Sequence, residues 1–326
     1  MGVEKIACNE NKKYSSSVDL AGLQCATPPA EKEAPEARFS GPMRGIYIDV
    51  NRGRNLELVK SLVQKGKPYG LNYIVVDVQP YASYRFLLNP EVIQYLKSEN
   101  IYIAGRVVCF QDGLMRKASE EKLKQLYELI EKTAAAGFDE VQLDYIRFAD
   151  DYTPYSLQSK YDYIEEILKQ ARATADKYNV KLGADLFGRV VYNKDDLIGQ
   201  KLENFAKYVD VIYPMLYPSH FTGDRKRLSN PGFTIHEGTT KGLDRLTGTR
   251  ATIQPFIQAF GYNVGYARMS YKDYIVAQIR AAEKTEARGW VAWNARAEYD
   301  TLFQAMEAIQ QDDKASTQQE AVPAEQ

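Results

Sequence analysis

Histidine and cysteine are scarce in this sequence, which contains two histidines, His220 and His236, and three cysteines. No CxxC, HExxH or other closely spaced set of such residues occurs. Protein zinc sites draw their ligands mainly from these residue types, so their scarcity argues against a dedicated zinc site. We expect neither a metal nor a cofactor.

The three cysteines lie in two different settings. Cys109 lies in an apolar run and is expected to be a small buried side chain. Cys8 and Cys25 lie in a polar N-terminal segment. They could form a disulfide if the protein is exported to an oxidising compartment.

An excess of charge and a long hydrophobic run are also missing. The 42 Lys and Arg residues balance 43 Asp and Glu residues, whereas nucleic acids and anionic membranes attract proteins with a basic excess. No apolar run could span a membrane, and residues 1–12 contain no signal-peptide core. Either the protein is cytosolic or a leader has been removed, and in the second case we expect a periplasmic or cell-surface location.

Tyrosine, by contrast, is abundant. The chain has 24 tyrosines, and aromatic residues make up 12% of it. Tyrosine combines a flat apolar face with a polar tip, which suits the faces and hydroxyl groups of a sugar. This composition favours a carbohydrate partner, although tyrosine is also common in ordinary barrels.

The composition divides the chain into a central domain and two tails. Residues 1–40 lack periodicity, and residues 311–326 are polar. Both carry too little apolar surface to offset the entropy of ordering, so we expect them to be disordered. Residues 41–310 are expected to form one catalytic domain.

Within this domain, short β-branched and aromatic runs alternate with helical patterns, which is typical of βαβ units. Eight units follow one another, and no GxGxxG follows the first strand. The pattern therefore favours a closed (β/α)8 TIM barrel over an open dinucleotide-binding sheet. The expected strands are 44–50, 72–79, 102–110, 140–146, 181–187, 209–216, 251–258 and 289–294, and the expected helices are 55–65, 90–98, 118–136, 158–178, 194–208, 236–246, 271–287 and 301–309.

The longest connections run from a strand to the following helix, at 80–89, 147–157, 217–235 and 259–270. In a barrel of this kind, these loops and the C-terminal ends of the strands form the active face. Polar residues at those strand ends are therefore the candidates for chemistry.

Three polar residues alternate along the fourth expected strand. Glu140, Gln142 and Asp144 point into the barrel if the apolar residues between them face the helices. Buried polar groups are costly unless they are paired or solvated, so an interior ion pair with Arg44 or Arg106 is one interpretation. For Glu140, near the start of the strand, we favour this ion pair.

Asp144 lies at the C-terminal end of the same strand, and we interpret it as catalytic. Arg147 could keep Asp144 ionised or clamp a group of the substrate. Asp185 ends the next strand, above the small Gly183, and is the second catalytic candidate. Neighbouring strands lie about 4.8 Å apart, so the two carboxyl groups could lie roughly 5 to 9 Å apart, as in retaining or inverting glycosidases. The alternative for Asp185 is a cap on the following turn.

Two further carboxylates, Asp49 and Asp77, end the first and second expected strands. Either could bind a sugar hydroxyl or supply the acid in place of Asp185. A cluster of aspartates could also hold a divalent cation through oxygen ligands, although no compact DxDxDG loop occurs.

The sixth expected strand supplies an aromatic wall. Tyr213 and Tyr217 share the parity of an inward face, and His220 follows them in the loop, where it could bond a hydroxyl or assist protonation. Trp293 is either a platform for a sugar ring or a core residue that closes the barrel. Two amides at strand ends complete the candidate substrate-binding residues: Gln258 and Asn294.

Five blocks of the sequence are distinctive: GFDEVQLDYIRF (137–148), GADLFG (183–188), IGQ (198–200), YPMLYPSH (213–220) and WVAWN (290–294). Together they resemble a bacterial family designated "putative glycoside hydrolase", which was first catalogued as a domain of unknown function. The resemblance extends from Arg44 to Tyr299 and implies a TIM barrel related to the α-amylase and α-galactosidase groups. In those groups a carboxylate ending strand four is typically the nucleophile, which implies that role for Asp144 and an acid/base role for Asp185.

The leading hypothesis is a glycoside hydrolase that acts on an envelope or matrix polysaccharide. Its main rival is an inactive glycan-binding barrel, because residues 111–117 are shorter than the family pattern and contain no tryptophan. A metal-dependent lyase or isomerase is a third hypothesis. A carboxyl separation beyond about 10 Å, or burial of either carboxylate in an ion pair, would exclude the two-carboxylate mechanism.

Overall fold

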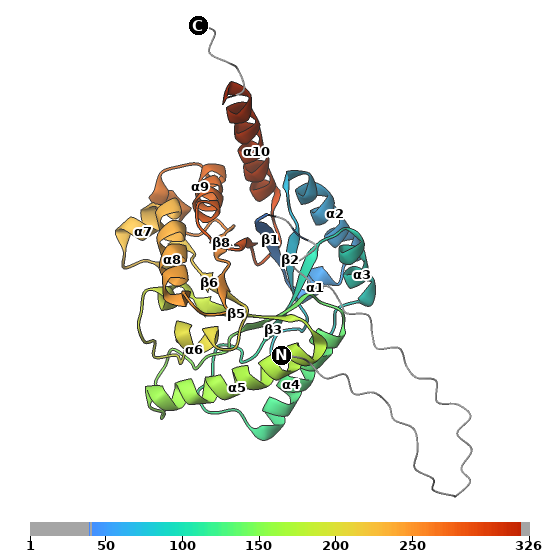
Figure 1. Ribbon diagram of the computed structural model, residues 1–326, viewed down its shortest axis with the longest axis vertical. Helices are drawn as coiled ribbons and strands as arrows, with labels where there is room; N and C mark the ends of the chain where they lie inside the picture. Colours follow the sequence, from blue (N-terminus) through green and yellow to red (C-terminus); the bar gives the residue numbers. More distant parts are fainter. Residues whose placement is uncertain (1–38, 40, 321–326) are drawn as a thin grey trace, which may run out of the picture. The chain divides into compact units, whose positions relative to one another are not determined.

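The computed structural model shows a closed barrel of parallel strands with helices around it (Figure 1). It describes Phe39 and residues 41–320. Cys8 and Cys25, with the disulfide expected between them, and nearly all of the expected N-terminal tail lie outside these residues. Cys109 is described, and it is buried with a free thiol, as the apolar run predicts.

The parallel sheet closes through pairing of β1 with β9 and of β5 with β6, which confirms the predicted (β/α)8 barrel. In the described residues its strands are β1 (Met43–Ile48), β2 (Tyr73–Asp77), β3 (Tyr102–Val108), β4 (Glu140–Asp144), β5 (Lys181–Phe187), β6 (Val211–Met215), β7 (Thr252–Ile253), β8 (Phe256–Gln258) and β9 (Gly289–Trp293).

The short strands β7 and β8 occupy one barrel position, where the sequence predicts a single strand. The interruption falls at Pro255, which has no N–H group to donate to a neighbouring strand. β6 pairs with β7 through Val211 and with β8 through Met215, so barrel closure is preserved across the break.

Helices and short 3-10 segments connect the strands. The α-helices are α1 (Val50–Gly53), α2 (Leu56–Gly66), α3 (Pro90–Ser98), α4 (Glu120–Ala135), α5 (Leu157–Tyr178), α6 (Leu202–Ala206), α7 (Arg225–Ser229), α8 (Pro231–Leu246), α9 (Tyr271–Glu283) and α10 (Asp300–Glu320). The 3-10 segments are η2 (Lys67–Tyr69), η3 (Gly188–Val191), η4 (Pro218–His220) and η5 (Val264–Ala267). Over the described range, no helix is both long and apolar enough to cross a membrane.

The helices α1 and α7 were not expected, α8 begins five residues early, and α9 ends four residues early. The differences at α6 and α10 are larger. α6 spans a single short turn of the expected 194–208, because the segment before it forms bends and turns and Gly199 adopts a left-handed φ of +80°. α10 continues ten residues past the expected start of a disordered tail at 311, so that expectation is wrong for 311–320. The side chains of 311–318 are exposed. A helix that buries no face needs no apolar residues at helical spacing, so the sequence of this segment did not predict a helix.

α8 is unbroken although two glycines lie within it. A Cβ atom at Gly238 would lie 2.6 Å from the Leu216 side chain, and one at Gly242 would lie 3.0 Å from Ile253. The glycines therefore let the helix pack closely against β6 and β7, and this contact offsets their low helix propensity.

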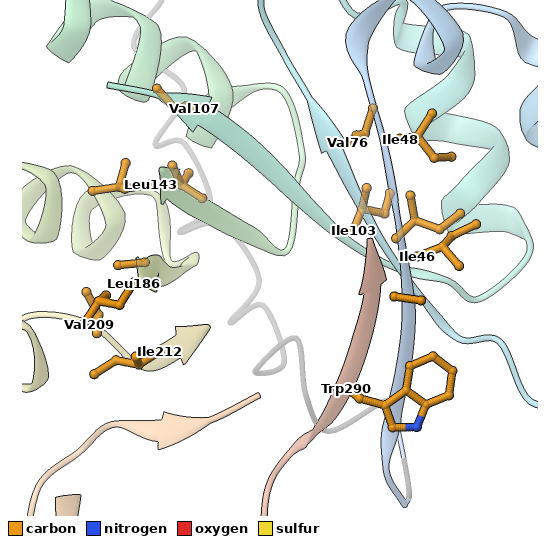
Figure 2. Close-up of a cluster of buried hydrophobic side chains, with 14 of the residues drawn as sticks. Ile46, Ile48, Val76, Ile103, Val107, Leu143, Leu186, Val209, Ile212 and Trp290 are labelled. Carbon is orange, nitrogen blue, oxygen red and sulfur yellow. The ribbon is translucent and has the colours of Figure 1, made fainter. Parts of the chain in front are cut away.

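Apolar side chains form two layers of core. The larger layer fills the space between strands and helices; Figure 2 shows Leu143 and Leu186 on one side of the barrel and Ile46 and Ile48 on the other. The smaller layer lies inside the barrel and includes Tyr73. Val141 and Leu143 belong to the outer layer, which confirms the predicted parity of β4.

A polar network lies inside the barrel, beneath the active face. Glu140 accepts hydrogen bonds from Tyr213 at 2.6 Å, from Arg288 at 3.0 Å and from Tyr102 at 3.1 Å. Tyr73 adds a 2.7 Å bond to Tyr213. Burial raises the pKa of Glu140, while Arg288 and the donated bonds counter the rise. The interior ion pair expected for Glu140 is confirmed.

The partner in this ion pair is Arg288 rather than Arg44 or Arg106. Arg44 instead bonds Glu283 at 2.7 Å, outside the barrel. Gly183 makes the network possible, because a Cβ atom there would lie 2.2 Å from a carboxylate oxygen of Glu140. The small residue thus leaves room inside the barrel, as predicted, and Glu140 fills that room.

Candidate active site

Strand register places the candidate residues at two levels near the C-terminal ends of the strands. Asp77 on β2 is level with Arg106 on β3, which is level with Gln142 on β4. Asp144 is the next inward residue after Gln142 on β4, and it is level with Val108 on β3. The inward side chains of four adjacent strands, β2 to β5, therefore converge on one point.

Arg106 lies at that point and contacts three carboxyl groups. Its Nη1 donates to Asp77 at 2.5 Å, its Nε donates to Asp185 at 3.1 Å, and its Nη2 donates to Asp144. The guanidinium also lies 5.2 Å from the centre of the Tyr47 ring. One buried cation thus pairs with three acidic side chains.

Asp144 is the acidic member of this group that faces open space. It is 4% exposed and lines the cavity described below. Arg106 holds one of its oxygens, and the backbone N–H of Tyr145 donates to the other at 2.5 Å. Tyr145 has a φ of +50°, a left-handed conformation that costs a non-glycine residue roughly 1–2 kcal/mol. Backbone strain thus lies directly beside the candidate carboxylate.

Asp185 lies deeper, is 1% exposed, and is not among the residues that line the cavity. Its two oxygens accept bonds from Arg106 and from the amide of Gln142. Burial, together with the negative charge of Asp144, raises the pKa of Asp185 well above its usual range. The alternative role of Asp185, a cap on the following turn, is therefore not observed.

Asp77 completes the group around Arg106. Tyr47 donates to its second oxygen at 2.6 Å. Burial raises the pKa of Asp77, while Arg106 and the bond from Tyr47 oppose the rise. These acids surround a guanidinium, and in the part of the chain that the structure describes no group of His, Cys, Asp or Glu is arranged to hold a metal ion.

A cavity of about 510 Å³ opens above Asp144 on the active face; we call it the main cavity. Tyr217, Phe260 and Trp293 form an aromatic wall along it. The full lining comprises Arg106, Asp144, Tyr145, Phe187, Gly188, Arg189, Met215, Tyr217, His220, Phe221, Phe260 and Trp293.

The aromatic wall is braced by ring contacts. Trp293 stacks on Tyr47 with centroids 5.3 Å apart and planes 10° apart, and Phe260 meets it edge to face at 5.9 Å. His220 packs edge to face on Tyr217 at 5.2 Å. Desolvation lowers the pKa of His220, so its imidazole is neutral near neutral pH. The predicted positions of Tyr217, His220 and Trp293 at one site are thus observed.

Arg147 does not hydrogen-bond Asp144, so the first of its two expected roles, keeping Asp144 ionised, is not observed. It is buried and donates to Asp150 at 3.2 Å, and its guanidinium lies 4.6 Å from the centre of the Phe187 ring. Arg189 lies at the same distance from Phe187 and pairs with Asp150 and Asp196. Asp144 pairs instead with Arg106, one of the two arginines that the sequence offered for an interior ion pair.

Two predicted sugar-binding residues at the first and sixth strands lie elsewhere. β1 ends at Ile48, and Asp49 begins the next helix, where it accepts bonds from two backbone N–H groups and pairs with Arg52 at 2.8 Å. Tyr213 is fully buried in the network around Glu140. Neither side chain reaches the main cavity.

The predicted amides Gln258 and Asn294 hold loops in place. Gln258 donates to the carbonyl groups of Phe260 and Tyr262, and its side-chain oxygen accepts from the backbone N–H of Ser219. This anchors the loop that carries Phe260 into the wall. Asn294 donates to the carbonyl oxygens of Ala259 and Glu298 and accepts from the N–H of Arg296.

Several residues of the site were not singled out from the sequence. Arg106 was considered only as an ion-pair partner, and its signal is a charged residue within the otherwise apolar β3. Tyr47 has the same inward parity on β1, while Phe187 and Phe260 follow or end strands on the active face. Aromatic residues at the C-terminal ends of strands could have been found by that position.

The arrangement favours chemistry centred on Asp144. Asp144 and Asp185 bond the same guanidinium, so its width limits their separation. Both are nevertheless buried in ion pairs, which excludes a mechanism in which both contact the substrate in this conformation. Asp144 alone of the two faces the main cavity.

Solved structures of carbohydrate-active enzymes share the fold. The chain is similar to the PgaB (BpsB) glycoside hydrolase domain from Bordetella bronchiseptica, with a TM-score of 0.59 and 13% identity over 82% of this chain and 99% of that one. A chitinase from Chromobacterium violaceum has a TM-score of 0.55 and 13% identity, over 82% of this chain and 98% of that one. An endo-1,4-β-D-mannanase from Thermotoga petrophila has a TM-score of 0.54 and 12% identity, over 78% of this chain and 88% of that one. Similarity at this level of identity establishes the barrel alone.

A comparison with curated protein sequences gave no significant match. A family model described as "Putative glycosyl hydrolase domain" matches residues 118–299, more than half of the chain. The matched segment contains Asp144, Asp185 and Trp293, which lie at or beneath the main cavity. By this match, the chain belongs to the "Putative glycosyl hydrolase domain" family.

Proposed function

We propose that the protein hydrolyses glycosidic bonds of a polysaccharide, such as an envelope or matrix glycan, in the main cavity. The observation that carries this proposal is the position of Asp144 at the base of an aromatic-walled cavity, at the C-terminal end of β4. Carboxylates at this end of barrel strands are commonly catalytic, and aromatic walls stack on sugar rings.

Asp144 acts as the nucleophile or the base in this proposal. The bonds from Arg106 and from the N–H of Tyr145 fix the direction of its oxygens. An oriented carboxylate is what either role requires.

Asp185 is the proposed acid. Its raised pKa favours the protonated form that an acid needs. Because Asp185 is covered, Arg106 must shift when the substrate binds, so that the leaving oxygen comes within reach. Catalytic contacts often form fully only in the complex with substrate.

The second candidate function is a glycan-binding barrel without turnover. The observation in its favour is the burial of Asp185 and its ion pair with Arg106. If Arg106 does not move, no second carboxyl group of this pair reaches the substrate, and the aromatic wall would bind glycan without cleaving it.

The test is a screen of soluble polysaccharides with the wild type, Asp185→Asn and Asp151→Asn. Asp151 is an exposed carboxylate in the loop after β4 and serves as the matched control. We expect reducing ends from the wild type and the control, and strongly reduced release from Asp185→Asn. Binding by the wild type without release of reducing ends would support the binding function instead.

A further inference from the structure

A second hollow lies beside the main cavity, on the far side of the Phe260–Trp293 pair. Its volume is about 630 Å³, and Phe260 and Trp293 line both spaces. Tyr271, Arg296 and Glu298 line the second hollow alone. We propose that it is a second carbohydrate subsite, so that one glycan chain occupies both spaces and crosses the aromatic pair between them.

The second hollow is built on a rigid loop. Asn294 bonds Ala259, Arg296 and Glu298 at 2.6 to 3.2 Å, which ties the loop after β9 to the strand beside it. Ala297 adopts a left-handed φ of +53°, a conformation that is costly for alanine and is held by these bonds. A surface fixed in this way can bind a ligand without a large ordering cost.

The polar groups of the second hollow are available for a ligand. Arg296 and Glu298 are exposed, and neither side chain bonds another residue of the described segment. Burial raises the pKa of Tyr271 to about 12, so its hydroxyl remains a hydrogen-bond donor at neutral pH. Charged and hydroxyl groups beside an aromatic edge suit the hydroxyls and ring faces of a sugar.

Exposed apolar side chains on the same face support an extended ligand. Those found among the described residues all belong to loops that lead from a strand to the next helix, and several are tyrosines. Apolar groups gathered on one face of a soluble domain mark an interaction surface. They are Tyr81, Met115, Tyr152, Leu197, Tyr262, Tyr266 and Met269.

The inference rests on the proposed carbohydrate function but not on turnover. A chain that fills both spaces has sugars on either side of the Phe260–Trp293 pair, so the preferred ligand is an oligomer or polymer. A single sugar or a disaccharide would occupy the main cavity alone.

The experiment measures binding of chito-oligosaccharides and manno-oligosaccharides, from dimers to hexamers, by calorimetry. The full chain carries Asp144→Asn throughout, so that turnover does not change the ligands. One variant adds Arg296→Ala and Glu298→Ala, whose backbone bonds remain. The matched control adds Lys284→Ala and Glu286→Ala, an exposed pair at the opposite end of the barrel.

We expect the hexamer to bind the second-hollow variant about tenfold more weakly than the control, with equal dimer affinities. Equal hexamer affinities, or no binding by any oligomer, would overturn the proposal. Hydrolysis by the wild type is assayed separately. If the wild type hydrolyses glycan but binding does not depend on oligomer length, the proposed function stands and the second subsite is rejected. If binding depends on oligomer length but no hydrolysis occurs, the second subsite stands and the hydrolase function is rejected.

Discussion

The Nε atom of Arg106 donates to Asp185 at 3.1 Å, and this bond joins β3 to β5 across the intervening β4. The same guanidinium bonds Asp77 and Asp144. Because buried carboxylates are stable only when they are paired or protonated, Arg106 is the cation that holds the acidic group together.

Removing Arg106 should destabilise the protein. Arg106→Met leaves buried acids without their cation, and we expect the free energy of unfolding to fall by about 3–5 kcal/mol. Urea denaturation measures this change. Arg189→Met, which removes a more exposed arginine at the same face, is the control and should cost far less. Equal losses for the two variants would contradict the central role of Arg106.

Asp185→Asn should change the pH dependence of stability. The raised pKa of Asp185 means that the folded state keeps a proton that the unfolded state releases above about pH 4. Stability from this group is therefore present below the unfolded pKa and is lost as the pH rises toward the folded pKa. We expect the wild type to lose more stability than Asp185→Asn between pH 4 and 8, as measured by denaturation.

The opposite pH trend would identify Asp185 as an ionised partner of Arg106. In that case the wild type would lose stability on acidification, and Asp185→Asn would be the less stable protein at neutral pH. Asp151→Asn should follow the wild type at every pH, because its carboxylate is exposed.

The network around Glu140 should contribute to stability alone. Arg288→Met leaves the fully buried Glu140 without its cation, so we expect a loss of about 3–5 kcal/mol in the free energy of unfolding. Glycan affinity of the folded fraction should be unchanged, because the network lies beneath the main cavity. Calorimetry with a polysaccharide that the wild type binds makes this comparison; weakened binding would place Arg288 in the site.

Trp293 should contribute to glycan binding through its ring. Trp293→Ala removes the indole between Tyr47 and Phe260, and we expect affinity to fall about tenfold or more, by the loss of roughly 1.5 kcal/mol. Trp293→Phe keeps an aromatic face and should retain most of the affinity. Equal affinity of Trp293→Ala and the wild type would show that the aromatic wall does not bind sugar.

The barrel and the inward parity of β4 were predictable because alternation and loop length are local properties of the sequence. Asp144 could be placed on the active face for the same reason. Asp144 pairs with Arg106 rather than with Arg44 or Arg147 because of how far each side chain reaches across the strands. The spacing of residues along the sequence carries no information about that reach.

The other differences between the predicted and the observed positions of site residues also have physical causes. Asp49 has the parity of an inward residue, but the strand ends one residue earlier and the chain turns into a helix. Gln258 and Asn294 bond loop carbonyl groups whose positions depend on the folded loops. The second hollow arises where two loops meet, so no single segment of sequence signals it.

The most direct measurement is the release of reducing ends by the wild type and by Asp144→Asn from a polysaccharide that both bind. We expect turnover to fall by about 10²–10⁴-fold in Asp144→Asn, with affinity nearly unchanged, because the substitution removes a catalytic charge and keeps the shape of the side chain. Equal turnover in the two proteins would contradict the assignment of Asp144. Binding without turnover in the wild type would contradict the hydrolase itself.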